Sequence, residues 1–317
     1  MIPRVSVVMA NYNYARFLRA AIDSVLNQTL RDLELIIVDD GSTDESRSII
    51  ESYLSDSRVR FVPVDHLGQP GAKNTGIDLA RAPLVAFLDA DDIWEFSKLE
   101  KQTTTFDRDP TLGVVYSRRR LIDENGNELP YRQPMLYRGD VLPHIFRDNF
   151  VCFSSAVVRR LVFEHLGRFD PSIDLAIDYD FWLRVAAHYR FDYVDEPLVR
   201  YRCGHGNLSR RVGERLKTAL LLMRRFLNRG GREKMLADSI HHSLAETFCH
   251  LGISLRPFDP PASTKWFLRS LSQDVKHRPA WRGLAKAMLP GRIRRLLANR
   301  HDWESAYRIA ENDPKNI

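Results

Sequence analysis

The first ninety residues alternate between apolar strand-like runs and segments with helical periodicity, and this alternation strongly limits the possible folds. The strand-like runs occupy residues 5–9, 33–38, 59–64 and 84–88, and the helical patterns between them occupy residues 17–26, 43–53 and 71–80. Strand–helix–strand units at this spacing form right-handed crossovers, so we expect an α/β fold with a mostly parallel sheet flanked by helices. Ser42 or Thr43 is expected to cap the second helix.

The pattern changes after residue 112 and again near residue 210. An Asn125-Gly126 pair predicts a hairpin, and helices are expected near residues 139–147, 160–166 and 180–188, followed by an extended segment over 193–201. From about residue 210 the sequence is helical and basic. We therefore expect a domain over residues 1–209 and a basic α-helical C-terminal region over residues 210–317.

The charge distribution supports the same division. The chain carries a formal charge of +6, but residues 206–317 hold 22 Lys and Arg against 10 Asp and Glu, which leaves the first 205 residues with a net charge of −6. With 44% hydrophobic and 28% charged residues, the composition excludes a disordered or collagen-like chain. Three dispersed cysteines, no long apolar run and no signal-peptide pattern lead us to expect a soluble cytoplasmic protein.

Polar residues follow three of the expected strands, at residues 11–13, 39–41 and 89–92. In an open α/β sheet, ligands bind beyond the carboxyl ends of the strands, so these three segments should converge on one site. The Asp-Ala-Asp-Asp run at 89–92 offers carboxylates that could share Mg²⁺ or Mn²⁺, ions that also retain water and phosphate ligands. The alternative for this run is an acidic turn that caps the following helix.

Five segments in this order resemble glycosyltransferase family 2, whose members have the GT-A (Rossmann-like) fold. They are residues 5–13, 24–29, 38–44, 71–76 and 87–94. The resemblance extends from residue 3 to about residue 209 and leaves the helical C-terminal extension unexplained. It implies an inverting transfer of a sugar from a nucleotide-diphosphate sugar to an acceptor hydroxyl.

The resemblance also implies roles for particular residues. Tyr12 would stack on the base and Asp40 would accept its imide hydrogen bond, while Asp89 would bind the ribose or metal-bound water. Asp91 would ligate the divalent cation, Mn²⁺ or Mg²⁺, that bridges the diphosphate. The full set of implied nucleotide-sugar contacts is Ala10, Tyr12, Asp39, Asp40, Lys73, Asp89, Ala90 and Trp94. A solvated position remains the alternative for Lys73, and a packed aromatic position for Trp94.

Residues 177–184 resemble the Glu-Asp motif that supplies the catalytic base of the family's inverting members. Asp178 matches the base, but Ile177 replaces the Glu that normally precedes it, which puts the acceptor contacts of that Glu in doubt. Asp174 and Asp180 are nearby alternatives, although an acidic residue in the first turn of a helix is favourable without any catalytic role.

Residues 201–209 resemble the stretch that often closes the catalytic domain, with an additional spacer at Gly204. His205 would then face the metal or the diphosphate. The alternative is an ordinary polar residue in a loop.

The expected partners are a nucleotide-diphosphate sugar donor and a carbohydrate or lipid-linked acceptor, in the assembly of a surface polysaccharide or another glycan. A nucleotidyltransferase on a similar fold and a non-catalytic scaffold are the alternatives. The basic C-terminal region, including residues 291–297, could contact an anionic membrane or form the solvated face of a helical bundle. No recognition motif indicates nucleic acid.

Overall fold

The computed structural model describes residues 2–204 and 212–289, which group into two compact units. The first unit comprises Met1–Val141 and Asn149–His205, and the second comprises Leu142–Asp148 and Gly206–Ile317. The expected boundary between residues 209 and 210 lies outside the described residues. The grouping of residues 142–148 with the C-terminal helices was not expected from the sequence.

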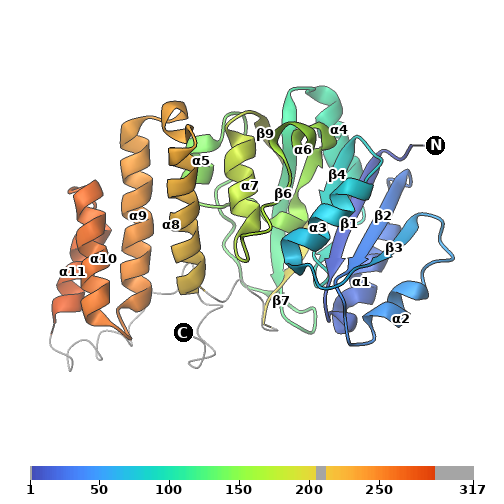
Figure 1. The fold of residues 1–317 in the computed structure, drawn as a ribbon, viewed down its shortest axis with the longest axis horizontal. Helices are drawn as coiled ribbons and strands as arrows, with labels where there is room; N and C mark the ends of the chain where they lie inside the picture. Colours follow the sequence, from blue (N-terminus) through green and yellow to red (C-terminus); the bar gives the residue numbers. More distant parts are fainter. Residues whose placement is uncertain (1, 205–211, 290–317) are drawn as a thin grey trace. The chain divides into compact units, whose positions relative to one another are not determined.

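The first unit contains a nine-stranded sheet in the order β3-β2-β1-β4-β8-β6-β9-β5, with β7 paired to β6 (Figure 1). The strands are β1 Val5–Asn11, β2 Leu33–Asp39, β3 Val59–Pro63, β4 Leu84–Phe87, β5 Ile93–Trp94, β6 Leu112–Ile122, β7 Glu128–Leu129, β8 Val157–Arg159 and β9 Arg190–Arg202. Parallel pairing joins β3, β2, β1 and β4, as the sequence predicts. β8 then pairs antiparallel with both β4 and β6, so the far half of the sheet is mixed.

The helices of this unit fall close to the expected segments. They are α1 Ala15–Leu26, α2 Ser46–Glu51, α3 Gly68–Leu79, α4 Lys98–Arg108, α6 Arg160–Leu166 and α7 Ile177–Ala186, with a 3-10 turn, η1, at Phe153–Ser155. The expected cap of α2 was wrong. The residue before α2 is Glu45, whose side chain makes no capping hydrogen bond, and Asp44 Oδ1 accepts the N–H of Ser46 at 3.0 Å. The Ser42 hydroxyl donates to Asp39 instead.

Both faces of β1 are covered, which explains its mostly apolar sequence. Val7 and Met9 pack in the same core cluster as Ile22 of α1. Val8 points to the other face, where α3 approaches closely at Gly76: a Cβ atom there would lie 2.4 Å from Val8 Cγ1. The sheet is therefore held between α1 and α3, with the ends of β1, β2 and β4 left to form the site.

The buried carboxylate of Glu34 links β1, β2, β3 and the segment before β4 at the amino ends of these strands, opposite the site. Glu34 of β2 is 2% exposed, accepts a hydrogen bond from Ser6 at 2.6 Å, and lies 2.8 Å from an Arg81 nitrogen and 3.4 Å from Arg60 Nη1. Burial alone would raise the pKa of Glu34, but the hydrogen bonds from Ser6 and Arg81 and the charge of Arg81 outweigh it, so the pKa lies below its usual 4.5. Glu34 therefore stabilises the fold in its charged form.

Glu34→Gln should lower the free energy of unfolding by about 2 kcal/mol at neutral pH, because hydrogen bonds to a charged group are lost. Since the pKa is lower in the folded than in the unfolded protein, the contribution is complete above about pH 4.5 and is lost as pH falls through the folded value. Urea unfolding of both proteins at several pH values checks this. A gap between the two that stays constant into the acid range would contradict the assignment.

The second unit is helical. It contains α5 Leu142–Arg147, α8 Val212–Asn228, the 3-10 turn η3 Gly231–Lys234, α9 Ala237–Leu255, α10 Pro260–Gln273 and α11 Arg278–Met288. α9 packs against α5, α8, α10 and α11, and Arg147 of α5 pairs with Glu246 of α9. None of the helices in the described residues is long and apolar enough to cross a membrane. The expected basic segment at residues 291–297 lies outside those residues.

Candidate active site

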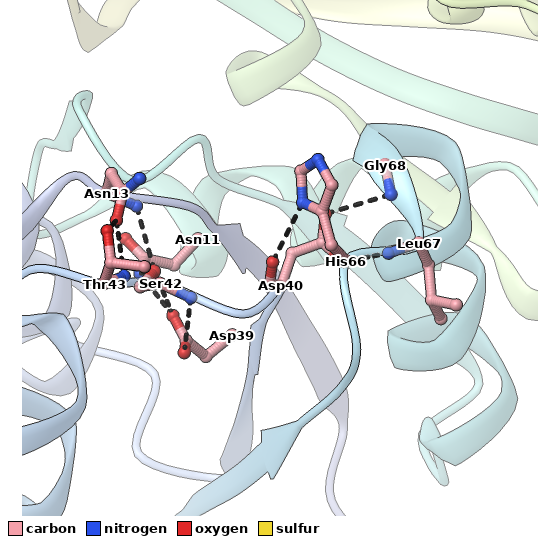
Figure 2. Close-up of polar contacts among 9 residues, drawn as sticks. All are labelled: Asn11, Asn13, Asp39, Asp40, Ser42, Thr43, His66, Leu67 and Gly68. Atoms are coloured by element: carbon pink, nitrogen blue, oxygen red, sulfur yellow. Dashed lines mark hydrogen bonds and ion pairs between the residues drawn. The ribbon is translucent and has the colours of Figure 1, made fainter.

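The carboxyl ends of β1 and β2 are joined by a polar network (Figure 2). Asn11 and Asp39 are register partners, and Asn11 Nδ2 donates to Asp39 Oδ1 at 2.7 Å. Ser42 Oγ donates to the same Asp39 oxygen at 2.6 Å. Asp39 is 4% exposed, and its carboxylate accepts both of these hydrogen bonds. In this structure Asp39 therefore stabilises the turn after β2.

Asn13 fixes the loop that carries Tyr12. Its backbone has φ +59°, in the left-handed region that Asn adopts more readily than most residues. Its Oδ1 accepts the backbone N–H of Thr43 at 2.7 Å, and its own N–H donates to Ser42 Oγ at 2.9 Å. The loop after β1 is therefore held to the loop after β2 (Figure 2).

Asp40, Tyr12 and His66 meet beside this network. The Asp40 carboxylate, 3% exposed, accepts the backbone N–H groups of Leu67 at 2.5 Å and Gly68 at 3.0 Å, where α3 begins. His66 Nδ1 lies 3.2 Å from Asp40 Oδ2, and the His66 ring lies 4.4 Å from the Tyr12 ring. Tyr12 is 43% exposed, so an aromatic surface stands beside a carboxylate.

His66 was not predicted from the sequence. It lies three residues after the end of β3. The sequence could have indicated it only through this position, beyond the carboxyl end of a third parallel strand.

The segment after β4 is held from both sides. Lys73 of α3 is 3% exposed, donates to Asp89 Oδ1 at 2.9 Å, and lies 3.9 Å above the Phe153 ring. The solvated position considered for Lys73 is therefore wrong. On the other side, Arg202 of β9 donates through Nε to the Asp91 carbonyl at 2.8 Å.

Asp92 is the buried member of this acidic run. It is 1% exposed and accepts hydrogen bonds from Ser154 Oγ at 2.5 Å and the Arg202 backbone N–H at 2.8 Å. Burial, and then the charges of Asp91 and Asp89, raise the pKa of Asp92 well above its usual value. Its contacts are therefore structural.

Tyr14, which also escaped the sequence analysis, belongs to the same site. Burial, followed by the charges of Asp91, Asp89 and Asp92, raises the pKa of its phenol.

Among the side chains that the structure describes, no group of three or more His, Cys, Asp and Glu is placed to hold a metal ion. The donor set nevertheless suits Mg²⁺ or Mn²⁺ in a substrate complex, because such ions are commonly held by one or two carboxylates together with substrate phosphates. Asp91, 9% exposed, is the side chain that would hold the ion, and Asp89 is engaged by Lys73.

Trp94, Ala10 and Ala90 occupy different surroundings. Trp94 is 4% exposed, donates through Nε1 to the Ser154 carbonyl at 2.7 Å, and lies 3.9 Å beneath Lys98 Nζ, as the packed alternative describes. Ala10 is half-buried at the end of β1 and Ala90 is buried between the acidic residues. A ligand contact from either alanine would involve mainly the backbone.

Asp178 lies in the first turn of α7, which begins after Ala176 at φ +58°. It is half-buried, and its Oδ2 accepts a hydrogen bond from Asn149 Nδ2 at 2.8 Å. Ile177, in the position of the family's Glu, is 3% exposed and offers no polar contact. Asn149 is a further residue that the sequence did not single out.

The two alternative carboxylates differ from Asp178. Asp180 is 8% exposed and pairs with Arg184 at 3.0 Å within α7, whereas Asp174 is exposed before the helix. One turn after Asp178, the Trp182 ring lies 6.4 Å from the Phe153 ring, which contacts Lys73. Packing thus connects the start of α7 to the Asp89 side of the site.

His205 lies outside the described residues, so its predicted position near the metal or diphosphate stays a prediction. The other predicted site residues come from the ends of β1, β2 and β4, from β5, from α3 and from α7.

The family model of glycosyl transferase family 2 matches residues 6–167, just over half of the chain. The chain belongs to glycosyltransferase family 2. A protein from Methanocaldococcus jannaschii described as an uncharacterized glycosyltransferase is 34% identical over 206 residues, 63% of this chain and 71% of that one. Family membership and these relatives assign the chain a glycosyltransferase role.

Two further relatives have named activities. The chondroitin synthase of Escherichia coli is 32% identical over 198 residues, 62% of this chain and 28% of the synthase. The hyaluronan synthase of Pasteurella multocida is 29% identical over 236 residues, 73% of this chain and 24% of the synthase. The chain thus matches about a quarter of the length of these synthases.

A solved structure shares the fold. Staphylococcus aureus TarS 1-349 in complex with UDP-GlcNAc aligns with a TM-score of 0.58 and 15% identity over 90% of each chain. At this identity the match shows the fold alone, and the fold is GT-A, with the additional C-terminal helices present.

Proposed function

We propose that this family-2 protein is an inverting glycosyltransferase that moves a sugar from a nucleotide-diphosphate sugar to an acceptor hydroxyl. The observation that carries the proposal is the convergence of the Tyr12–His66–Asp40 group and the Asp89–Asp91 turn at the ends of neighbouring parallel strands. Because related chains include chondroitin and hyaluronan synthases, we assign the reaction to the assembly of a surface polysaccharide or another glycan.

The donor would lie across the ends of β1, β2 and β4. The Tyr12 ring would stack on the base, and His66 behind it would hold the ring in place. Lys73 would supply positive charge near the ribose and diphosphate through its contact with Asp89. TarS has been crystallised with UDP and with UDP-GlcNAc, which supports a donor of this class for a chain of the same fold.

Asp91 would hold the Mn²⁺ or Mg²⁺ ion of the substrate complex. When bound, such an ion stabilises the negative charge that develops on the departing diphosphate. The buried Asp92 would keep the acidic turn in place through Ser154 and Arg202.

Asp178 would remove the proton of the acceptor hydroxyl while that oxygen attacks the anomeric carbon. The bond to the diphosphate oxygen breaks in the same displacement, so the configuration inverts and no covalent enzyme intermediate forms. The hydrogen bond from Asn149 orients the carboxylate and leaves its second oxygen for the acceptor. A general base in this position contributes about 10²–10⁴-fold to such reactions.

A screen of nucleotide sugars tests the proposal. The full chain with Mn²⁺ should release a nucleoside diphosphate from at least one donor, and the transferred sugar should have the opposite anomeric configuration by NMR. Release of pyrophosphate from a nucleoside triphosphate and a sugar phosphate would instead identify a nucleotidyltransferase. A folded protein that hydrolyses no donor and transfers no sugar would be a scaffold.

Tyr12 offers a quantitative prediction. Tyr12→Ala should weaken nucleoside diphosphate binding by about tenfold, because base–aromatic stacking contributes about 1–3 kcal/mol per base. Tyr12→Phe keeps the ring and should bind within about twofold of the wild type on the same grounds. Isothermal titration calorimetry of the three proteins measures this; equal affinity of the Ala variant would remove Tyr12 from the nucleotide site.

A further inference from the structure

Helix α11 has apolar side chains on two of its sides. One side is buried and belongs to the core of the C-terminal unit, through Ala280, Leu284 and Ala287. The other side is exposed: Trp281 is 51% exposed, Ala285 is exposed and Met288 is 73% exposed. Residues spaced by four and three positions lie on the same side of a helix, so these three form a second stripe.

The stripe continues into the turn before α11. Val275 is 65% exposed, and its carbonyl accepts a hydrogen bond from Trp281 Nε1 at 2.8 Å. We call Val275, Trp281, Ala285 and Met288 the outer stripe. Within the described residues, the core of the unit is completed by the buried side of α11, so the outer stripe is not required for its packing.

The surroundings of the outer stripe are positively charged. Residues 260–289 contain six Lys and Arg and a single acidic residue, Asp274. Lys276, Arg278 and Arg282 are exposed next to the stripe, and Lys286 is half-buried within the same helix. The Asp274 carboxylate lies 3.4 Å from His242 Nδ1 of α9. The single acidic side chain of this segment therefore contacts α9.

We propose that the outer stripe and its flanking cations form a docking surface for an anionic lipid bilayer. Tryptophan is favoured at the headgroup level of a bilayer, and Met288 and Val275 would enter the acyl boundary beside it. Each Lys or Arg close to an anionic leaflet contributes about 1 kcal/mol. The apolar stripe thus suits the acyl boundary of the bilayer, and the flanking cations suit its anionic headgroups.

Charge argues against two other occupants. Residues 291–300, which follow α11, carry four Arg and no Asp or Glu, so covering the stripe with this segment would bring like charges together. A symmetric contact between two copies would likewise place the same basic surface against itself. An anionic partner removes this repulsion.

Vesicle flotation with the full chain tests the proposal. The protein should bind vesicles of phosphatidylcholine mixed with phosphatidylglycerol, should bind less as salt is raised, and should not bind phosphatidylcholine alone. Trp281→Ser with Met288→Ser should reduce binding about tenfold or more, because apolar burial is lost. The matched control is Leu221→Ser with Leu236→Ser, which removes two side chains of the same unit that are 65% and 81% exposed.

Three results would overturn the proposal. The stripe variant could bind anionic vesicles as well as the wild type. Binding could instead depend on Arg292, Arg294 and Arg295, with a triple Arg→Glu variant losing it while the stripe variant keeps it. Light scattering could show a wild-type oligomer that the stripe variant splits, which would make the stripe a contact between copies. Donor hydrolysis should remain at wild-type levels in the stripe variant, which separates this test from that of the proposed reaction.

Discussion

Asp178→Asn should stop sugar transfer and leave donor binding intact. The substituted amide keeps the size of the side chain, and its oxygen can still accept the hydrogen bond that Asn149 now donates at 2.8 Å. It cannot take the proton of the acceptor hydroxyl. We expect kcat to fall by about 10²–10⁴-fold, the contribution of a positioned general base, while calorimetry should give an unchanged affinity for the nucleoside diphosphate.

The neighbouring carboxylates provide matched controls. Asp174→Asn changes an exposed residue before α7 and should leave kcat unchanged. Asp180→Asn weakens the ion pair with Arg184, so it should lower the unfolding temperature and leave kcat nearly unchanged. Normal turnover in Asp178→Asn would remove Asp178 as the base, and a large kcat loss confined to Asp174→Asn or Asp180→Asn would transfer the role to that residue.

Asp91→Ala should abolish the metal-dependent part of donor binding. Asp91 is the residue that we propose as the ligand of the ion, in the position that the family resemblance implies, while Asp89 contacts Lys73 and Asp92 is buried against Ser154. In the wild type, Mn²⁺ should raise nucleoside diphosphate affinity, and the variant should bind with the same weak affinity with or without the ion. Calorimetric titrations in Mn²⁺ and in EDTA measure the difference.

Asp65→Ala is the control for this change. It removes the same charge from an exposed residue beside His66 and should retain the full effect of Mn²⁺. If Asp91→Ala still gains affinity from Mn²⁺ as the wild type does, the ion is held elsewhere.

The parallel half of the sheet could be predicted from the sequence because β1, β2 and β4 are buried on both faces. Val8 contacts Gly76 of α3 while Val7 and Met9 belong to the α1 side, so successive positions of β1 are apolar and the run is easily recognised. The end of each run then marks a site segment. The antiparallel insertion of β8 between β4 and β6 could not be predicted, because three residues carry no distinctive periodicity.

The individual roles within the site were harder to predict, because they depend on partners far away in sequence. Lys73 resembles an ordinary helix lysine until Asp89 and Phe153 are seen around it. Serine is a residue type that often caps helices, but the hydroxyl of Ser42 donates its hydrogen bond to Asp39. His66 and Asn149 lie in segments with no local motif, and only the fold brings them to Asp40 and Asp178.

We propose that the ends of β1, β2 and β4 bind a nucleoside diphosphate together with a divalent cation. Thermal unfolding of the full chain with the diphosphates of each common base, with and without Mn²⁺, measures this directly. A ligand at about 100 times its Kd stabilises a protein by about 2.7 kcal/mol, which corresponds to roughly 5–10 °C in Tm for a domain of this size. We expect such a shift for at least one base, larger with Mn²⁺, and the increase due to Mn²⁺ should be absent in Asp91→Ala. Unfolding temperatures unchanged by every nucleoside diphosphate would contradict it.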